Sequence, residues 1–249
     1  MKNMEHSLPS SLRYDFHLHS DFSDGMNTIE EMIFACLDQE ITHMAITDHL
    51  SETGYFNWYN QYEKDAKKLP RYLNTINKMK LKYQGKIKIY AGAEISTDFG
   101  LRTKHYSGEE DIFSLYLDRF SIFLIEGWYI SNPYRSAINL RKYLDELGYS
   151  DIPISIAHPE FTHFSHKKFS KLIKMGIGIE LNESKFSGII AQDFLRIYKQ
   201  LTDIEKSQLN ITIGSDAHYA DGAGKLQSVH KFIDETNLKK NVILPKEIQ

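Results

Sequence analysis

The sequence has very little cysteine and no long apolar run. Cys36 is its one cysteine, so an internal disulfide is excluded, and its apolar neighbours predict a structural residue buried on a helix. No run of about 18 apolar residues occurs, which excludes a membrane-spanning helix. Residues 1–13 lack the continuous apolar segment of a secretion signal. We therefore expect a cytoplasmic protein with a short N-terminal extension over these residues.

Basic residues form no stripe or cluster along the chain. The net charge is −3, and 30 Lys and Arg are scattered among 33 Asp and Glu. This distribution argues against broad binding to nucleic acid or to a membrane surface, and it leaves a small anionic substrate open. No Gly-, Ser- or Pro-rich tract, charge block or internal repeat divides the chain, so we expect a single domain over residues 1–249. No sequence feature indicates an oligomeric state.

Short apolar segments rich in β-branched and aromatic residues alternate with longer amphipathic segments. This order predicts an α/β fold of parallel strands joined by crossover helices. Strands are expected at residues 14–19, 43–48, 87–95, 120–127, 152–158, 176–181 and 211–216. Helices are expected at residues 29–37, 62–83, 134–147, 167–175, 189–201 and 226–235, and Asn27 or Thr28 can cap the first of them. The number of strands is close to that of a closed barrel.

Residues of metal-ligand type stand at the ends of these expected strands. In the first strand, the period-two alternation aims His17 and His19 to the same side, where they can share one metal ion. The other strand ends carry His49, Glu94, Glu126, His158, Asp216 and His218. Each alone has an ordinary structural explanation, such as a salt bridge across a barrel mouth. The ends of parallel barrel strands converge on one face, so together these residues predict one metal site.

These residues and their spacing resemble the motifs of the PHP (polymerase and histidinol phosphatase) superfamily. The matching segments cover nearly the whole chain: His17-Leu18-His19, Asp24 in Ser23-Asp24-Gly25, Thr47-Asp48-His49, Gly92-Ala93-Glu94, His158-Pro159 and Gly214-Ser215-Asp216-Ala217-His218. The stretch from Glu180 to Ser184 also resembles the sixth strand of that family's phosphatases. The resemblance implies a distorted (β/α)7 barrel, similar to a TIM barrel, that holds three divalent metal ions.

The resemblance also implies which residues bind each metal. The first metal would be bound by His17, His19, Glu94 and Asp216; the second by Glu94 as a bridge, Glu126 and His158; and the third by Asp24, His49 and His218. A set of imidazoles and carboxylates without thiolate favours zinc, manganese or iron. Asp48, which precedes His49, is expected to orient that ligand.

This ligand set predicts hydrolysis of a phosphate ester by a metal-bridging hydroxide, with no covalent intermediate on the protein. The cations would neutralise the phosphoryl oxygens, over which charge spreads in the transition state. Arg102 and Arg135, in loops after the third and fourth strands, are candidates to bind those oxygens. His105, close to Arg102, is a further candidate for substrate contact. The ordinary alternative for a loop arginine is a solvated side chain.

The resemblance implies a phosphatase acting on a small phosphomonoester. L-histidinol phosphate, an intermediate of histidine biosynthesis, is the best named candidate, because the size and motifs are similar to stand-alone histidinol phosphatases. Many of those enzymes have a histidine where this chain has Glu126, and a carboxylate there is similar to PHP-type protein tyrosine phosphatases. A tyrosine phosphatase is therefore the alternative.

Three other functions fit the sequence less well. A nuclease would need a basic groove, which the scattered charges do not supply. An amidohydrolase barrel would normally bring a carboxylated lysine and end in a lone aspartate, whereas this chain has Asp216 followed two residues later by His218. A non-catalytic metal-binding scaffold would usually have lost ligands, and here every expected position holds a coordinating residue.

Overall fold

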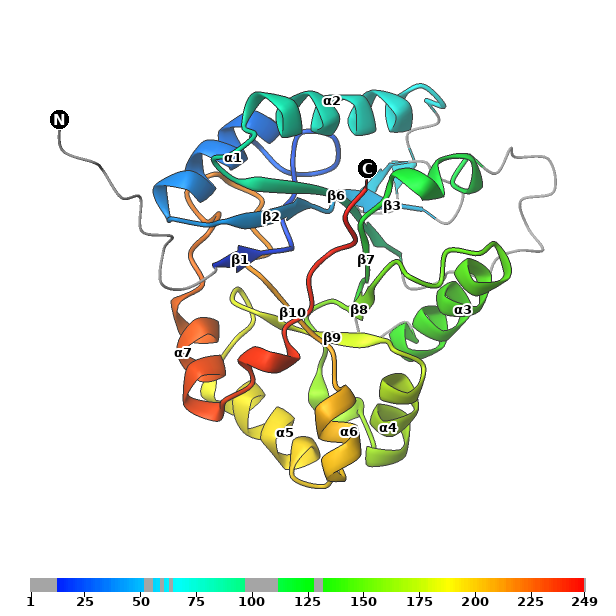
Figure 1. Ribbon diagram of the computed structural model, residues 1–249, viewed down its shortest axis with the longest axis vertical. Coiled ribbons are helices and arrows are strands. Elements are labelled where there is room, and N and C mark those ends of the chain that lie inside the picture. The colour runs from blue at the N-terminus through cyan, green and yellow to red at the C-terminus, as the bar shows by residue number, and fades with distance from the viewer. Residues whose placement is uncertain are drawn as a thin grey trace, which may run out of the picture.

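A nearly closed parallel sheet forms the centre of the fold (Figure 1). The computed structural model describes residues 13–51, 56–58, 61–62, 65–96, 112–127 and 132–248. In spatial order the strands are β1 (Tyr14–Asp15), β2 (His43–Ile46), β6 (Lys88–Ile95), β7 (Ile122–Ile125), β8 (Ile154–Ile156), β9 (Gly178–Asn182) and β10 (Ile211–Gly214). β3 (His49–Leu50) also pairs with β6, and each of these pairings is parallel.

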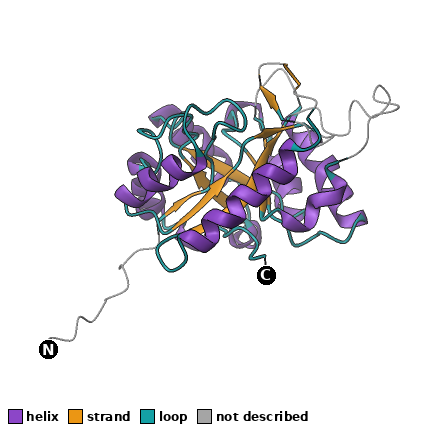
Figure 2. Ribbon diagram, turned by 90° about the horizontal axis from the view of Figure 1, so that it is seen from above, coloured by secondary structure: helices purple, strands orange, loops and turns teal. Residues whose placement is uncertain are grey.

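Backbone hydrogen bonds join the first strand to the last. Phe16 N donates to Ile213 O at 2.9 Å, and Asp216 N donates to His17 O at 2.9 Å. The helices lie outside the strands in both views (Figures 1 and 2). The expected α/β, TIM-barrel-like fold is therefore confirmed.

The six expected helices are all present, and all but the second begin and end close to the expected residues. They are α1 (Ile29–Asp38), α2 (Lys68–Lys82), α3 (Pro133–Glu146), α4 (His166–Lys174), α5 (Gly188–Tyr198) and α7 (Gln227–Thr236). Thr28 caps α1, because its hydroxyl accepts from Glu31 N at 3.3 Å and the Glu31 carboxylate accepts from Thr28 N at 2.7 Å. The buried Cys36 on α1 agrees with its expected structural role.

The second helix begins at Lys68, six residues after the expected start at 62. Pro70 explains the later start, because a proline without an N–H fits the first turn of a helix but breaks its interior. The residues before it form a short antiparallel pair of β4 (Asn57–Trp58) and β5 (Gln61–Tyr62). Tyr62, the first residue of the expected helix, thus belongs to β5 instead.

A further helix, α6 (Asp203–Gln208), was missed. Its first turn carries a capping box of Thr202 and Glu205, a signal that is present in the sequence. Three short 3-10 helices complete the described elements: η1 (Ser114–Arg119), η2 (Phe161–His163) and η3 (Lys239–Asn241).

Side chains between the sheet and the helices fix the strand ends. β7 is buried along its whole length, and α1 buries Ile29, Met32 and Ile33 against the sheet. The buried Tyr72 hydroxyl of α2 lies 2.8 Å from Ile46 O and 2.9 Å from Gly92 O, to which it donates. Within the described segments, each helix is too short or too polar to span a lipid bilayer.

Candidate metal centre

The carboxyl ends of the strands bring the expected ligands together. His17 and His19 follow β1, Asp24 lies in the next loop, His49 is in β3, Glu94 is in β6, Glu126 follows β7, His158 follows β8, and Asp216 and His218 follow β10. Two groups have ligand atoms close enough to hold a metal ion: His17, His19 and Glu94, and His19, Asp24, His49 and His218.

Glu94 is the centre of the cluster. Its Oε2 atom lies 3.2 Å from His17 Nε2, 3.4 Å from His19 Nε2 and 3.3 Å from His49 Nδ1. Its Oε1 atom lies 3.1 Å from His158 Nε2. The two oxygens thus face different histidines, as a carboxylate that bridges two cations would.

Asp216, which follows the last strand, faces the same pair of histidines that follows the first. Its Oδ1 atom lies 3.5 Å from His17 Nε2 and 3.4 Å from His19 Nε2, and these two nitrogens lie 3.0 Å apart. His19 Nδ1 is buried and has no hydrogen-bond partner in the described part of the chain. Nitrogen lone pairs facing each other beside carboxylates are satisfied by a cation placed among them, so this donor set fits a divalent metal.

A third group of contacts surrounds Asp24. Its Oδ2 atom lies 3.2 Å from His218 Nε2 and 3.6 Å from His49 Nε2, and its Oδ1 atom lies 3.7 Å from His19 Nδ1. His19 therefore lies between this group and the Glu94 group. The resemblance had implied that His19 serves the first metal alone.

Burial and the mixture of charges shift the pKa values in the cluster. Burial raises the pKa of Glu94, but the surrounding histidines outweigh it and hold that pKa well below its usual value. Burial also raises the pKa of Asp24, but the contact with His218 and the neighbouring imidazoles outweighs it and lowers that pKa to about 2. Burial lowers the pKa of His19 and of His49. A lower pKa favours the neutral imidazole, the form that binds metals.

The charges of the cluster also shift the pKa of Glu126. Burial and the charge of Glu94 raise the pKa of Glu126 to about 7, while His49 and His158 partly offset them. A divalent cation would favour the charged form of such a carboxyl group, because it replaces the neighbouring like charge as the nearest strong field.

Glu180 is a buried residue of β9 that was not among the expected site residues. Its Oε1 atom lies 2.9 Å from His17 Nδ1, and its Oε2 atom accepts from His158 N at 2.7 Å and from Asn182 Nδ2 at 3.0 Å. A Cβ atom on Gly214 would lie 2.5 Å from Glu180 Oε1, so only glycine leaves room for this contact. Burial lowers the pKa of His17, but Glu180 and the ligand carboxylates outweigh it and raise that pKa well above its usual value.

Two of the expected ligands have left-handed backbone conformations. His158 has a φ of 27° and Asp216 a φ of 58°, which are unfavourable for residues with a Cβ. The Glu180 carboxylate binds the amide of His158, and His17 O binds the amide of Asp216. Hydrogen bonds from neighbouring residues in the site therefore stabilise the backbone at the two positions where its conformation is unfavourable.

Asp48 does not have the contact that was expected of it. Its carboxylate accepts hydrogen bonds from Ser20 N at 2.7 Å and Ser20 Oγ at 2.6 Å, and from the Ser23 hydroxyl. Asp48 lies between β2 and β3, and the hydrogen bonds that its side chain makes with described residues go to Ser20 and Ser23, not to His49. It fixes the loop that carries Asp24 instead.

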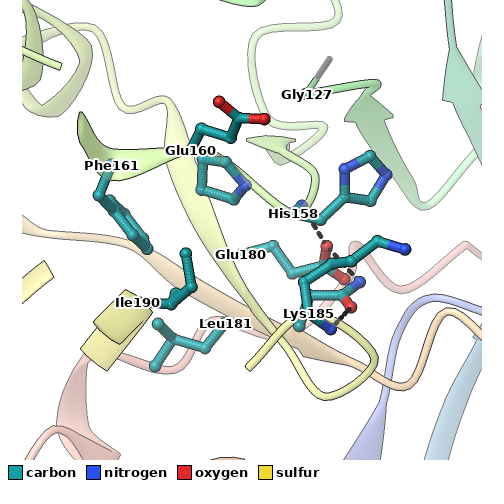
Figure 3. Close-up of a pocket in the computed structure, with 10 residues that line it drawn as sticks. Gly127, His158, Glu160, Phe161, Glu180, Leu181, Lys185 and Ile190 are labelled. Carbon is teal, nitrogen blue, oxygen red and sulfur yellow. Dashed lines mark hydrogen bonds between the residues drawn. The ribbon is translucent and has the colours of Figure 1, made fainter. Parts of the chain in front are cut away.

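A cavity of about 310 Å³ adjoins the cluster at His158 and Glu180 (Figure 3). Lys185 lines this cavity and was not among the expected substrate-binding residues. Arg135 is exposed in the first turn of α3. Arg102 and His105 lie outside the described residues.

The family comparison agrees with the motifs. A family model described as "PHP domain" matches residues 15–243. The chain belongs to the PHP domain family. No curated protein matches the chain.

Solved structures of PHP-type proteins share its fold. Histidinol phosphate phosphatase of Lactococcus lactis, solved with zinc, L-histidinol and phosphate, is 16% identical at a TM-score of 0.57, over 90% of this chain and 94% of that one. One of the metal-dependent tyrosine phosphatases YwqE of Bacillus subtilis and CpsB of Streptococcus pneumoniae is 18% identical at a TM-score of 0.50, over 95% and 98%. At these identities the likeness shows the fold. Family and site together support a metal-dependent phosphoesterase, a hydrolase.

Proposed function

We propose that this PHP protein hydrolyses small phosphomonoesters at a centre of three divalent cations. The observation that carries this proposal is the convergence of imidazole and carboxylate ligands around Glu94, within 3.1–3.4 Å of four histidines. Bound cations would activate a water molecule as the nucleophile and neutralise the charge of the phosphate. Zinc, manganese and iron all suit this ligand set.

The chain's own residues would divide this work. In our proposal His17, His19, Glu94 and Asp216 hold one cation; Glu94, Glu126 and His158 a second; and Asp24, His49 and His218 a third. Glu180 fixes the proton of His17 on Nδ1, which leaves the Nε2 lone pair free for a cation. The strained backbone of His158 is held by the same carboxylate.

Phosphate would also need cationic side chains. Lys185 reaches the cavity beside His158, and its ammonium makes no ion pair with the described residues. We propose Lys185 for this role, and we keep Arg102, Arg135 and His105 as further candidates from the sequence.

L-histidinol phosphate is the first substrate to test. The Lactococcus lactis relative, of the same fold, was solved with L-histidinol and phosphate. Phosphotyrosine is the second, and Glu126 favours it, because this carboxylate resembles the tyrosine phosphatases of the family at that position.

The test is phosphate release from both esters by metal-reconstituted protein, with metal content measured by elemental analysis. His17→Ala and Asp216→Ala are expected to lose both bound metal and activity. The control His166→Ala removes an imidazole on α4, outside the cluster, and is expected to keep both. A metal-loaded wild-type protein that releases no phosphate from any monoester would contradict the proposal.

A further inference from the structure

The cavity beside the metal centre has two chemically different ends. His158, Glu180 and Lys185 lie on one side of it, and Phe161, Leu181 and Ile190 gather on the other (Figure 3). The His158 ring belongs to both the metal cluster and the cavity wall, since its Nε2 atom lies 3.1 Å from Glu94 Oε1. A phosphate bound at the cluster would therefore point its ester group along this cavity.

The size of the cavity limits that group. At about 310 Å³ it lies at the lower end of the usual range for small-molecule sites, about 300–1,000 Å³. A group of the size of one aromatic ring with a short linker fills such a space.

The carboxylates that line the cavity already have partners. Glu180 receives three hydrogen bonds, from His17, His158 and Asn182. Glu160 lies 2.9 Å from His163 Nε2, and its carboxylate points away from Phe161 and Ile190 (Figure 3). Among the described residues, the far end thus offers apolar surface and no free anion, and an ammonium group placed there would lose its hydration without compensation.

We propose that this cavity is the leaving-group pocket and that it selects phosphomonoesters of uncharged aromatic or aliphatic alcohols over esters that carry an ammonium group. The inference rests on the phosphatase function proposed above and narrows its substrate: it favours the phosphotyrosyl ester over L-histidinol phosphate, which carries an ammonium group. Ile190, which is partly exposed, determines the specificity because it packs against the alcohol, and the buried Phe161 and Leu181 lie beside it in the cavity wall. Lys185 lies at the polar end and binds the phosphate common to all substrates.

The matched substrates are 2-phenylethyl phosphate and 2-aminoethyl phosphate, both primary alkyl esters, so that they differ mainly in the group inside the cavity. Metal-loaded wild-type protein is expected to hydrolyse the phenylethyl ester with a kcat/KM at least about tenfold higher. Ile190→Glu places a carboxylate at the apolar end and is expected to lower kcat/KM for the phenylethyl ester about tenfold and to raise it for the aminoethyl ester. Lys185→Met is expected to lower kcat/KM for both esters by a similar factor.

Ile189→Glu is the matched control. Ile189 is the preceding residue on α5, is 71% exposed and does not line the cavity. The same charge added there is expected to leave the ratio of the kcat/KM values for the two esters unchanged. Binding of the non-hydrolysable 2-phenylethyl and 2-aminoethyl phosphonates, measured by calorimetry, gives a readout independent of turnover.

The two proposals fail in different ways. Hydrolysis of both esters with equal kcat/KM, or equal effects of Ile190→Glu and Ile189→Glu, would overturn the pocket and leave the phosphatase intact. Selective binding of the phenylethyl phosphonate without hydrolysis of any ester would support the pocket and contradict the phosphatase.

Discussion

Replacing Glu180 with glutamine tests whether a residue that binds no metal controls metal affinity. The carboxylate accepts from His17 Nδ1 on one oxygen and from His158 N and Asn182 Nδ2 on the other. In Glu180→Gln one oxygen becomes an NH₂ group. The better orientation keeps the two donors on the remaining oxygen, so the new NH₂ faces His17 Nδ1.

That orientation changes the tautomer of His17. To accept from the glutamine, Nδ1 must release its proton, which then resides on Nε2, the atom that faces Glu94 and Asp216. Loss of such an orienting partner typically weakens metal affinity 10- to 100-fold, or about 1.4–2.7 kcal/mol. At metal concentrations well above Kd, the metal-induced stabilisation should fall by the same amount.

Two measurements check this prediction. Competition with a chromophoric chelator gives the metal affinity, and ¹⁵N NMR of the imidazoles in the metal-free protein, recorded at a pH above the raised pKa of His17, gives the tautomer of His17. Glu160→Gln is the control, because it removes a carboxylate from the same cavity without touching His17. Wild-type metal affinity together with an unchanged tautomer in Glu180→Gln would refute the reasoning.

Three further predictions concern metal content, buried charge and pH. Elemental analysis of Asp24→Asn should find about one metal equivalent fewer than in the wild type, and an unchanged stoichiometry would contradict a separate third site. Ser215→Ala should lower the free energy of unfolding by about 1–3 kcal/mol in urea titrations, because the buried Asp15 carboxylate loses the Ser215 hydroxyl at 2.7 Å. The Ser170 hydrogen bond and others lower the pKa of Glu205 to about 2 from 4.5. The cost of Glu205→Gln should therefore be full above about pH 4.5 and shrink as the pH falls towards 2, whereas a constant cost would contradict the shift.

Much of the fold could be predicted because its signals are local. Alternation of short apolar and longer amphipathic segments finds every main strand and all but one α-helix, although β1 ends at Asp15, short of the expected residue 19, and α2 begins six residues late. The errors also have local causes. Pro70 delays the start of α2, and the capping box of Thr202 and Glu205 begins α6.

The cluster could be predicted because ligand types stand at strand ends and the barrel brings those ends together. The contacts that support the cluster could not be predicted. Glu180 and His17 are 163 residues apart, and no local pattern shows that they meet. Lys185 and Ile190 lie after β9, and their place at the cavity depends on how η2 and α5 pack against the barrel.

The buried carboxylates of this site form two sets with different tasks. Glu94 and Asp216 face the histidines, where a cation would offset their charge. Asp15, Asp48 and Glu180 tie one strand end to the next: Asp15 accepts from Ser215 and Gly224, Asp48 from Ser20 and Ser23, and Glu180 from His158. The side of the sheet does not separate the two sets, because Asp15 lies two residues before His17 and strand alternation would aim both the same way. What separates them is the neighbours that each carboxylate contacts. The expected ligands follow from residue type and position, whereas the supports are defined by donors far away in the chain, and we expect the loss of a support to disturb the geometry of the site before it disturbs the fold.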